Sequence, residues 1–174
     1  CSLGYPAALA ESAGTDGKYH VPGASVVVIN DSKIEWAKGY GFQEIGLDAK
    51  VSSETLFQAA SISKPVSAIA ALKLVEDGKF DLTQNVNQVL SSWEVPENEF
   101  TQKNKVTLKG ILSHTAGLTV QGFRGYSTDE EIPTLQNILD GSSPANSESI
   151  RVDLEPGSEN RYSGGGYTVM QQLL

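Results

Sequence analysis

The sequence reads Phe57-Gln58-Ala59-Ala60-Ser61-Ile62-Ser63-Lys64-Pro65 at the point where a helical pattern begins. Apolar residues recur at helical spacing after Ser61, and Gly78 supplies a stop signal. Pro65 falls within the first turn, where its missing N–H costs little. The pattern predicts a buried, central helix that begins at Ser61 and carries an apolar side made of Val66, Ile69, Leu72 and Val75.

Ser61 and Lys64 form an S-x-x-K pattern at the start of this helix. Residues three apart share a helix face, with about 5–6 Å between their β-carbons, so the Lys64 amine can reach the Ser61 hydroxyl. A serine needs a base to become a nucleophile, and lysine can serve if burial and the positive helix N-terminus lower its pKa. The Ser61 N–H could then supply half of an oxyanion hole. The alternative is Ser61 as a helix cap and Lys64 as an exposed residue.

The residues before this helix predict an antiparallel hairpin. Residues 24–29 form a short apolar run, and residues 33–41 alternate between apolar and polar side chains. Asn30-Asp31-Ser32 supplies turn chemistry between them. Residues 6–13 are rich in helix formers, and residues 14–17 break that pattern.

Short helices joined by loops are predicted for the remainder. Thr107 can cap a helix over residues 108–114 that Gly117 ends, and residues 134–140 form another between Pro133 and Gly141. The other expected elements are one helical turn within 81–90, a turn at 155–157, an extended or looped segment at 161–163 and a last helix from Tyr167. That helix has no stop signal before Leu174, so we expect the sequence to be the front part of a longer one.

Composition excludes several classes of partner. The formal net charge is −8, with 21 acidic and 13 basic residues among 174, and such a balance repels a phosphate backbone, so we expect no nucleic-acid partner. No apolar run approaches the roughly 18–20 residues that cross a bilayer. His20 and His114 are far apart, and with a single cysteine they predict no metal site.

Cys1 is the only cysteine, so no internal disulfide can form. Followed by Ser2, it could be the lipid-bearing residue of a processed bacterial lipoprotein, or it could remain from proteolysis. We expect membrane contact only if Cys1 is lipidated.

Three segments in the same order resemble one protein family. The stretch 57–65 resembles the nucleophile segment of the class C-like branch of the serine β-lactamase and penicillin-binding-peptidase superfamily. Ile111-Leu112-Ser113-His114-Thr115-Ala116-Gly117-Leu118 resembles its L-L-S-H-T-S/A-G-L signature, and residues 161–167 stand where the family has Tyr-x-Asn. The branch includes D-alanyl-D-alanine carboxypeptidases, D-aminopeptidases and β-lactamase-like esterases. The resemblance runs from about residue 21 to the end.

The resemblance implies an α+β, β-lactamase/transpeptidase-like fold, in which an antiparallel sheet is flanked by helices beside a mostly helical part. We expect residues 1–174 to be a single incomplete catalytic domain. Residues 1–50 would supply a helix and the first two strands, and residues 51–174 the mostly helical part. The family's third motif, Lys or His before Thr/Ser-Gly, does not follow Tyr162, so the C-terminal strands are expected to be missing from this chain.

Carried over to this sequence, the resemblance makes Ser61 the acylated nucleophile, Lys64 its partner and Tyr162 the phenol that relays protons to the leaving group. A nearby ammonium favours the phenolate, so Lys64 and Tyr162 could share one proton. Gly164 replaces the family's asparagine at a substrate-binding position, which weakens the expectation of β-lactamase activity. The resemblance implies a structural role for His114 at a helix end, rather than a Ser–His pairing.

The implied function is hydrolysis or transfer of an acyl group through a Ser61 ester, with no cofactor. The expected substrates are peptides ending in D-amino acids or small esters, with β-lactamase activity as an alternative. An alternative of another class is a non-catalytic penicillin-binding or ligand-sensing relative. We expect this chain to be inactive alone, with the rest of the domain as a further partner if it is a separate chain. The family favours a periplasmic or extracellular location.

Overall fold

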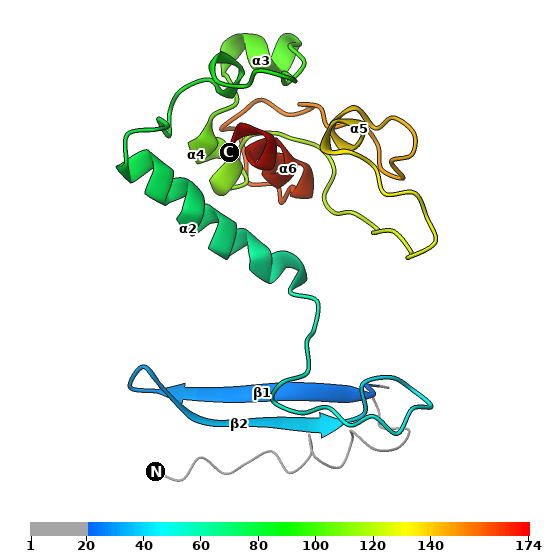
Figure 1. Cartoon of the computed structure of the whole chain (residues 1–174). Helices are drawn as coiled ribbons and strands as arrows, with labels where there is room; N and C mark the ends of the chain where they lie inside the picture. Colours follow the sequence, from blue (N-terminus) through cyan, green and yellow to red (C-terminus); the bar gives the residue numbers. More distant parts are fainter. Residues whose placement is uncertain (1–20) are drawn as a thin grey trace. The chain divides into compact units, whose positions relative to one another are not determined.

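The computed structural model describes residues 21–174, which fall into two compact units on either side of the Ala59–Ala60 bond. The first contains an antiparallel hairpin, and the second contains the helices (Figure 1). The helix predicted at residues 6–13 lies outside the described residues. Within residues 21–174, no helix combines the length and apolar character needed to cross a membrane.

The hairpin of the first unit pairs β1 (Gly23–Asn30) with β2 (Lys33–Gly41), which confirms the prediction. Asp31 and Ser32 form its turn, with φ of 47° and 59°. Two positive φ angles in a two-residue turn match the right-handed twist of the flanking strands. The register shifts after Val28, which marks a bulge.

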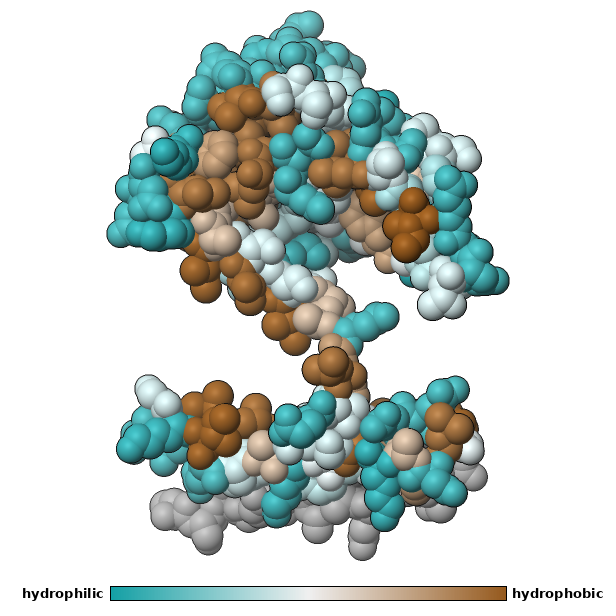
Figure 2. Space-filling view, viewed as in Figure 1, coloured by the Kyte–Doolittle hydropathy of each residue, from teal (hydrophilic) through white to brown (hydrophobic). Residues whose placement is uncertain are grey.

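Helix α2 (Ser63–Glu76) begins the second unit, after a single 3₁₀ turn, η1 (Ala60–Ile62). Gly78, with φ of 70°, follows its end as predicted. Within the second unit taken by itself, Val66 and Ile69 are 66% and 69% exposed, so the core of this unit does not cover the apolar side of α2 that the sequence predicts to be buried. That core contacts the side of α2 that carries Ala71 and Val75, and hydrophobic side chains gather on the face of the second unit that Figure 2 shows.

The core of the second unit gathers around three short helices, α4 (Leu108–Leu112), α5 (Leu135–Asp140) and α6 (Gly164–Leu173). Thr107 caps α4 as predicted, and Gly141, with φ of 64°, ends α5 as predicted. Thr134, predicted as the first residue of α5, is its cap instead. The largest fully buried side chains are Val86, Leu108, Ile111, Leu118, Leu139, Ile150, Val152, Val169 and Met170. Because these come from both helices and loops, the core fixes the loops between helices as well.

Two predicted helix limits are wrong. Helix α4 ends at Leu112, two residues before the predicted end at His114, and His114 itself adopts a left-handed φ of 57° before Gly117 is reached. Helix α6 begins at Gly164, three residues before the predicted start at Tyr167. Its first N–H groups find acceptors in a neighbouring loop and in the Ser163 side chain, so tertiary contacts overcome the low helix propensity of glycine.

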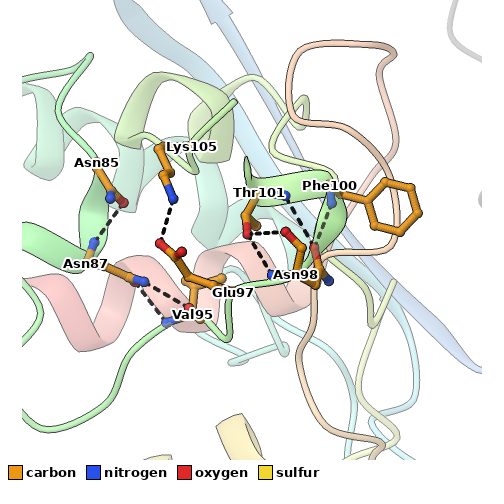
Figure 3. Close-up of polar contacts among 8 residues, drawn as sticks. All are labelled: Asn85, Asn87, Val95, Glu97, Asn98, Phe100, Thr101 and Lys105. Carbon is orange, nitrogen blue, oxygen red and sulfur yellow. Dashed lines mark hydrogen bonds and ion pairs between the residues drawn. The ribbon is translucent and has the colours of Figure 1, made fainter. Parts of the chain in front are cut away.

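The structure also contains η2 (Val86–Gln88), the helical turn expected within 81–90, and a helix that sequence patterns missed, α3 (Glu99–Lys103). Asn98 caps α3 through a reciprocal bond pattern with Thr101 (Figure 3). Lys105 pairs with Glu97 beside it, at 2.6 Å between Nζ and Oε1. A helix this short shows no apolar period in the sequence, and its N-terminal cap is the feature that stabilises it.

Candidate active site

Ser61 lies in the 3₁₀ turn that leads into α2, and its side chain is exposed. The residue before it, Ala60, has φ of 44°, in the left-handed region that alanine rarely adopts. Strained backbone of this kind persists only where the surrounding structure imposes it, and it clusters at functional sites. The turn presents the Ser61 hydroxyl at the N-terminal end of a helix.

Two other predicted site residues meet at the Ser61 hydroxyl. The Lys64 amine, in the first turn of α2, donates to Ser61 Oγ in the preceding 3₁₀ turn at 3.2 Å. The Tyr162 hydroxyl donates to the same oxygen at 2.6 Å, from the loop that precedes α6. Local helix geometry produces the first contact, whereas only the tertiary fold brings Tyr162 to Ser61.

The charge of Lys64 acts directly on Tyr162. A hydrogen bond with Lys64 lowers the pKa of the Tyr162 phenol, and the bond with Ser61 lowers it further. Lys64 Nζ also lies 4.9 Å from the ring centroid of Tyr162 and 5.7 Å from that of Tyr167, a residue of α6. The ammonium therefore favours the phenolate form of Tyr162. Burial, followed by the charge of Tyr162, raises the pKa of Tyr167.

His114 contacts Tyr162 but does not pair with Ser61. Its ring lies 4.4 Å from the Tyr162 ring and 5.4 Å from the Tyr167 ring, measured between centroids. Its Nδ1 accepts the Ser163 N–H at 3.2 Å, and within residues 21–174 it has no hydrogen bond to Ser61. Burial and, secondarily, the positive charge of Lys64 lower the pKa of His114, which favours the neutral ring.

Gly164 is buried in the first turn of α6, where its N–H donates to Gln121 O at 3.0 Å. A β-carbon there would lie 3.1 Å from the same carbonyl oxygen. Gly164 lines a cavity of about 320 Å³ together with Lys64, Tyr167 and other residues of α2 and α6. A role in substrate binding stays a prediction.

A loop that sequence reasoning missed holds the start of α6. Ser163 Oγ donates to Thr119 O at 2.8 Å, and the Gly165 N–H donates to Val120 O at 2.9 Å. Val120 has φ of 61°, which is rare for a β-branched residue. The three consecutive glycines, Gly164, Gly165 and Gly166, were the available sequence signal, since glycine allows close backbone approach. No sequence pattern indicated that Tyr167, which lies beside Lys64 and His114, would be part of the site.

Metal ligands do not gather in this structure. Among residues 21–174, no group of three or more histidine, cysteine, aspartate and glutamate side chains is placed to hold a metal ion.

Known proteins are similar to this chain over most of its length. Protein flp of Staphylococcus aureus (strain MRSA252) is 27% identical over 157 residues, which cover 90% of this chain and 30% of flp. The solved octameric penicillin-binding protein homologue from Pyrococcus abyssi matches with a TM-score of 0.65 at 23% identity, over 88% of this chain and 34% of that one. The β-lactamase/D-alanine carboxypeptidase from Yersinia pestis gives 0.64 at 23% identity, over 87% and 42%.

These matches agree on the fold and on how much of it is present. The chain spans about a third of the length of the curated relative and of the Pyrococcus structure. A sequence model of the family described as Beta-lactamase matches residues 8–174, which is nearly all of the chain. With its hairpin, its helices and this match, the chain belongs to the beta-lactamase family.

Proposed function

We propose that the protein is a serine hydrolase that works through an acyl-enzyme on Ser61. The observation that carries the proposal is the meeting of two proton-handling groups on one hydroxyl: Lys64 Nζ at 3.2 Å and Tyr162 OH at 2.6 Å from Ser61 Oγ. A serine hydroxyl becomes a useful nucleophile when an adjacent base takes its proton. Membership of the beta-lactamase family supports the same chemistry.

The chemistry needs the phenolate form of Tyr162, which Lys64 favours. The phenolate accepts the Ser61 proton while Ser61 Oγ forms a bond to the substrate carbonyl carbon. As the tetrahedral intermediate collapses, the bond to the leaving group breaks, and Tyr162 returns the proton to the departing amine or alcohol. Water then attacks the Ser61 ester, one proton passes back to Ser61, and the acid product leaves.

The positive charge of Lys64 acts on the protonation of two neighbouring side chains. Its ammonium stabilises the phenolate before attack, and the same charge opposes protonation of His114. Removing the Lys64 charge should therefore reduce the phenolate population of Tyr162. The Ser61 N–H, at the N-terminal end of α2, supplies one donor to the oxyanion.

For the substrate, we propose peptides ending in D-amino acids or small esters, with β-lactams hydrolysed more slowly. The Yersinia neighbour bears both activities in its name, β-lactamase and D-alanine carboxypeptidase, so the fold accommodates both. Gly164 provides no side chain to hold a substrate amide, and its surroundings leave little space for one. This feature favours peptidase or esterase chemistry over efficient β-lactam hydrolysis.

Labelling with a fluorophosphonate tests the proposal, because the reagent bonds only to a reactive serine. Because the chain spans about a third of its relatives' length and is expected to be inactive alone, the protein tested is one that contains this chain together with the rest of the catalytic domain. We expect its intact-mass spectrum to show one adduct, which peptide mapping places on Ser61. Ser61→Ala should abolish labelling, whereas Ser63→Ala, two residues along the same exposed turn, should label at close to the native rate. An unlabelled native protein would favour the ligand-sensing alternative, and labelling that follows Ser63 would refute the assignment.

Once the protein is shown to label, its kcat/KM values can be compared for three substrates: a D-alanyl-D-alanine peptide, p-nitrophenyl acetate and a chromogenic cephalosporin. The proposal expects higher kcat/KM for the peptide or the ester than for the cephalosporin. The reverse order would make β-lactamase the better description.

A further inference from the structure

One residue holds the chain on both sides of Tyr162. The Arg161 N–H donates to the His114 carbonyl oxygen at 2.8 Å, and the Ser163 N–H donates to the His114 ring at Nδ1, at 3.2 Å. The N–H groups of the residues immediately before and after Tyr162 are therefore tied to a residue almost 50 positions earlier in the chain. Backbone N–H groups in a loop need such partners, and here one residue supplies both.

The backbone of His114 makes this double contact possible. Its φ of 57° places it in the left-handed region just beyond α4, a conformation in which histidine, asparagine and aspartate are enriched. The position is anchored by bonds from the His114 N–H to Ile111 O at 3.1 Å and from the Thr115 N–H to Gly110 O at 2.8 Å. His114 is thus attached to the core through α4, while its carbonyl and its ring both serve the Tyr162 loop.

The ring of His114 also contacts the phenol itself. It lies 4.4 Å from the Tyr162 ring, tilted by 35°, and 5.4 Å from the Tyr167 ring. The groups that face the His114 ring are Lys64 of α2, Tyr162 of the loop before α6, and Tyr167 of α6. An acceptor at Nδ1 requires an unprotonated nitrogen there, so the neutral ring carries its proton on Nε2.

We infer that His114 is a positioning residue that holds the Tyr162 phenol against Ser61 and Lys64 by accepting hydrogen bonds from the N–H groups of Arg161 and Ser163, the residues on either side of Tyr162. The inference rests on the proposed role of Tyr162 in proton transfer. His114 moves no proton in this scheme, because the nitrogen that faces the loop is occupied by the Ser163 N–H. A displacement of about 1 Å in a reacting group can reduce a rate by 10²-fold, so such a clamp has a measurable effect.

A matched pair of substitutions isolates the side-chain bond. His114→Asn and His114→Gly both suit the left-handed backbone and both remove the ring, but only asparagine keeps an acceptor close to the position of Nδ1. We expect His114→Asn to label Ser61 with fluorophosphonate within about 10-fold of the native rate, and His114→Gly to label about 100-fold more slowly. Melting temperatures of the two variants, measured alongside, separate positioning from loss of fold.

The ionisation of Tyr162 provides a readout that needs no activity. With tyrosine labelled by ¹³C at Cζ and assigned through Tyr162→Phe, the inference expects the Tyr162 pKa to stay lowered in His114→Asn and to rise toward 10 in His114→Gly, because the phenol leaves Lys64. If His114→Gly fails to fold, His114→Phe, which also lacks an acceptor, takes its place. Equal labelling rates and equal Tyr162 pKa values in folded asparagine and glycine or phenylalanine variants would overturn the inference. Native protein that titrates as expected but never labels would instead refute the proposed function.

Discussion

Gly165→Ala should destabilise the protein because the start of α6 lies against the backbone of the 119–121 loop. A β-carbon at residue 165 would lie 2.6 Å from Thr119 O and 3.1 Å from Ile150 Cγ1. Real β-carbons essentially never approach another atom within 3.0 Å. The carbonyl belongs to the backbone, so the loop or the helix must move.

The expected loss can be worked from three terms. Overpacking of this kind costs about 1–3 kcal/mol. The shift also strains the bond from the Gly165 N–H to Val120 O, worth about 1 kcal/mol. Replacing glycine by alanine inside a helix returns about 1 kcal/mol. The net destabilisation is about 1–3 kcal/mol, which lowers the melting temperature by several degrees.

Gly166→Ala is the matched control. A β-carbon there would meet Leu118 Cδ1 and Ser163 Oγ at 3.5 Å, an ordinary contact distance. Both glycines are buried in the same turn of α6, so the helix-propensity gain is common to both. We expect Gly166→Ala to be neutral or stabilising. Urea unfolding followed by circular dichroism measures the difference, and a Gly165→Ala protein as stable as Gly166→Ala would show that the loop does not constrain the helix.

Three further predictions concern the charges of the site. Lys64→Ala and Tyr162→Phe should each slow the labelling of Ser61 heavily. The double variant should raise the activation free energy of labelling by much less than the sum of the two single increases, and simple additivity would refute a coupled pair. The labelling rate should rise with pH through the lowered pKa of Tyr162, and Lys64→Ala should move that rise to higher pH, toward 10; a profile unmoved by the substitution would exclude Lys64 as its cause. The folded protein holds the pKa of His114 below 6.5, so the unfolded chain binds the proton first as the pH falls. The free energy of unfolding should therefore decrease as the pH falls from 6.5 toward the folded pKa. Urea unfolding between pH 7 and 5 should show a smaller decrease in His114→Asn than in the native protein.

Sequence patterns predicted the elements that depend on local chemistry. The hairpin followed from alternation and a turn, and the helix after Ser61 followed from its period and from Gly78. The same patterns missed α3, because five residues are too few to show a period and Asn98 caps it. They placed the start of α6 too late because glycine disfavours a helix until a neighbouring loop accepts its N–H groups.

The sequence by itself determined that Ser61 and Lys64 share a helix face, because a separation of three residues brings side chains together in any α-helix. Only the tertiary structure decided that Tyr162, 101 residues later, donates to the same hydroxyl, and that His114 accepts hydrogen bonds from the N–H groups of the residues before and after Tyr162. It also decided that the core of the second unit contacts α2 at Ala71 and Val75, and not at Val66 and Ile69. Contacts between distant residues depend on how the helices and loops pack around a shared core, and no local pattern encodes that packing.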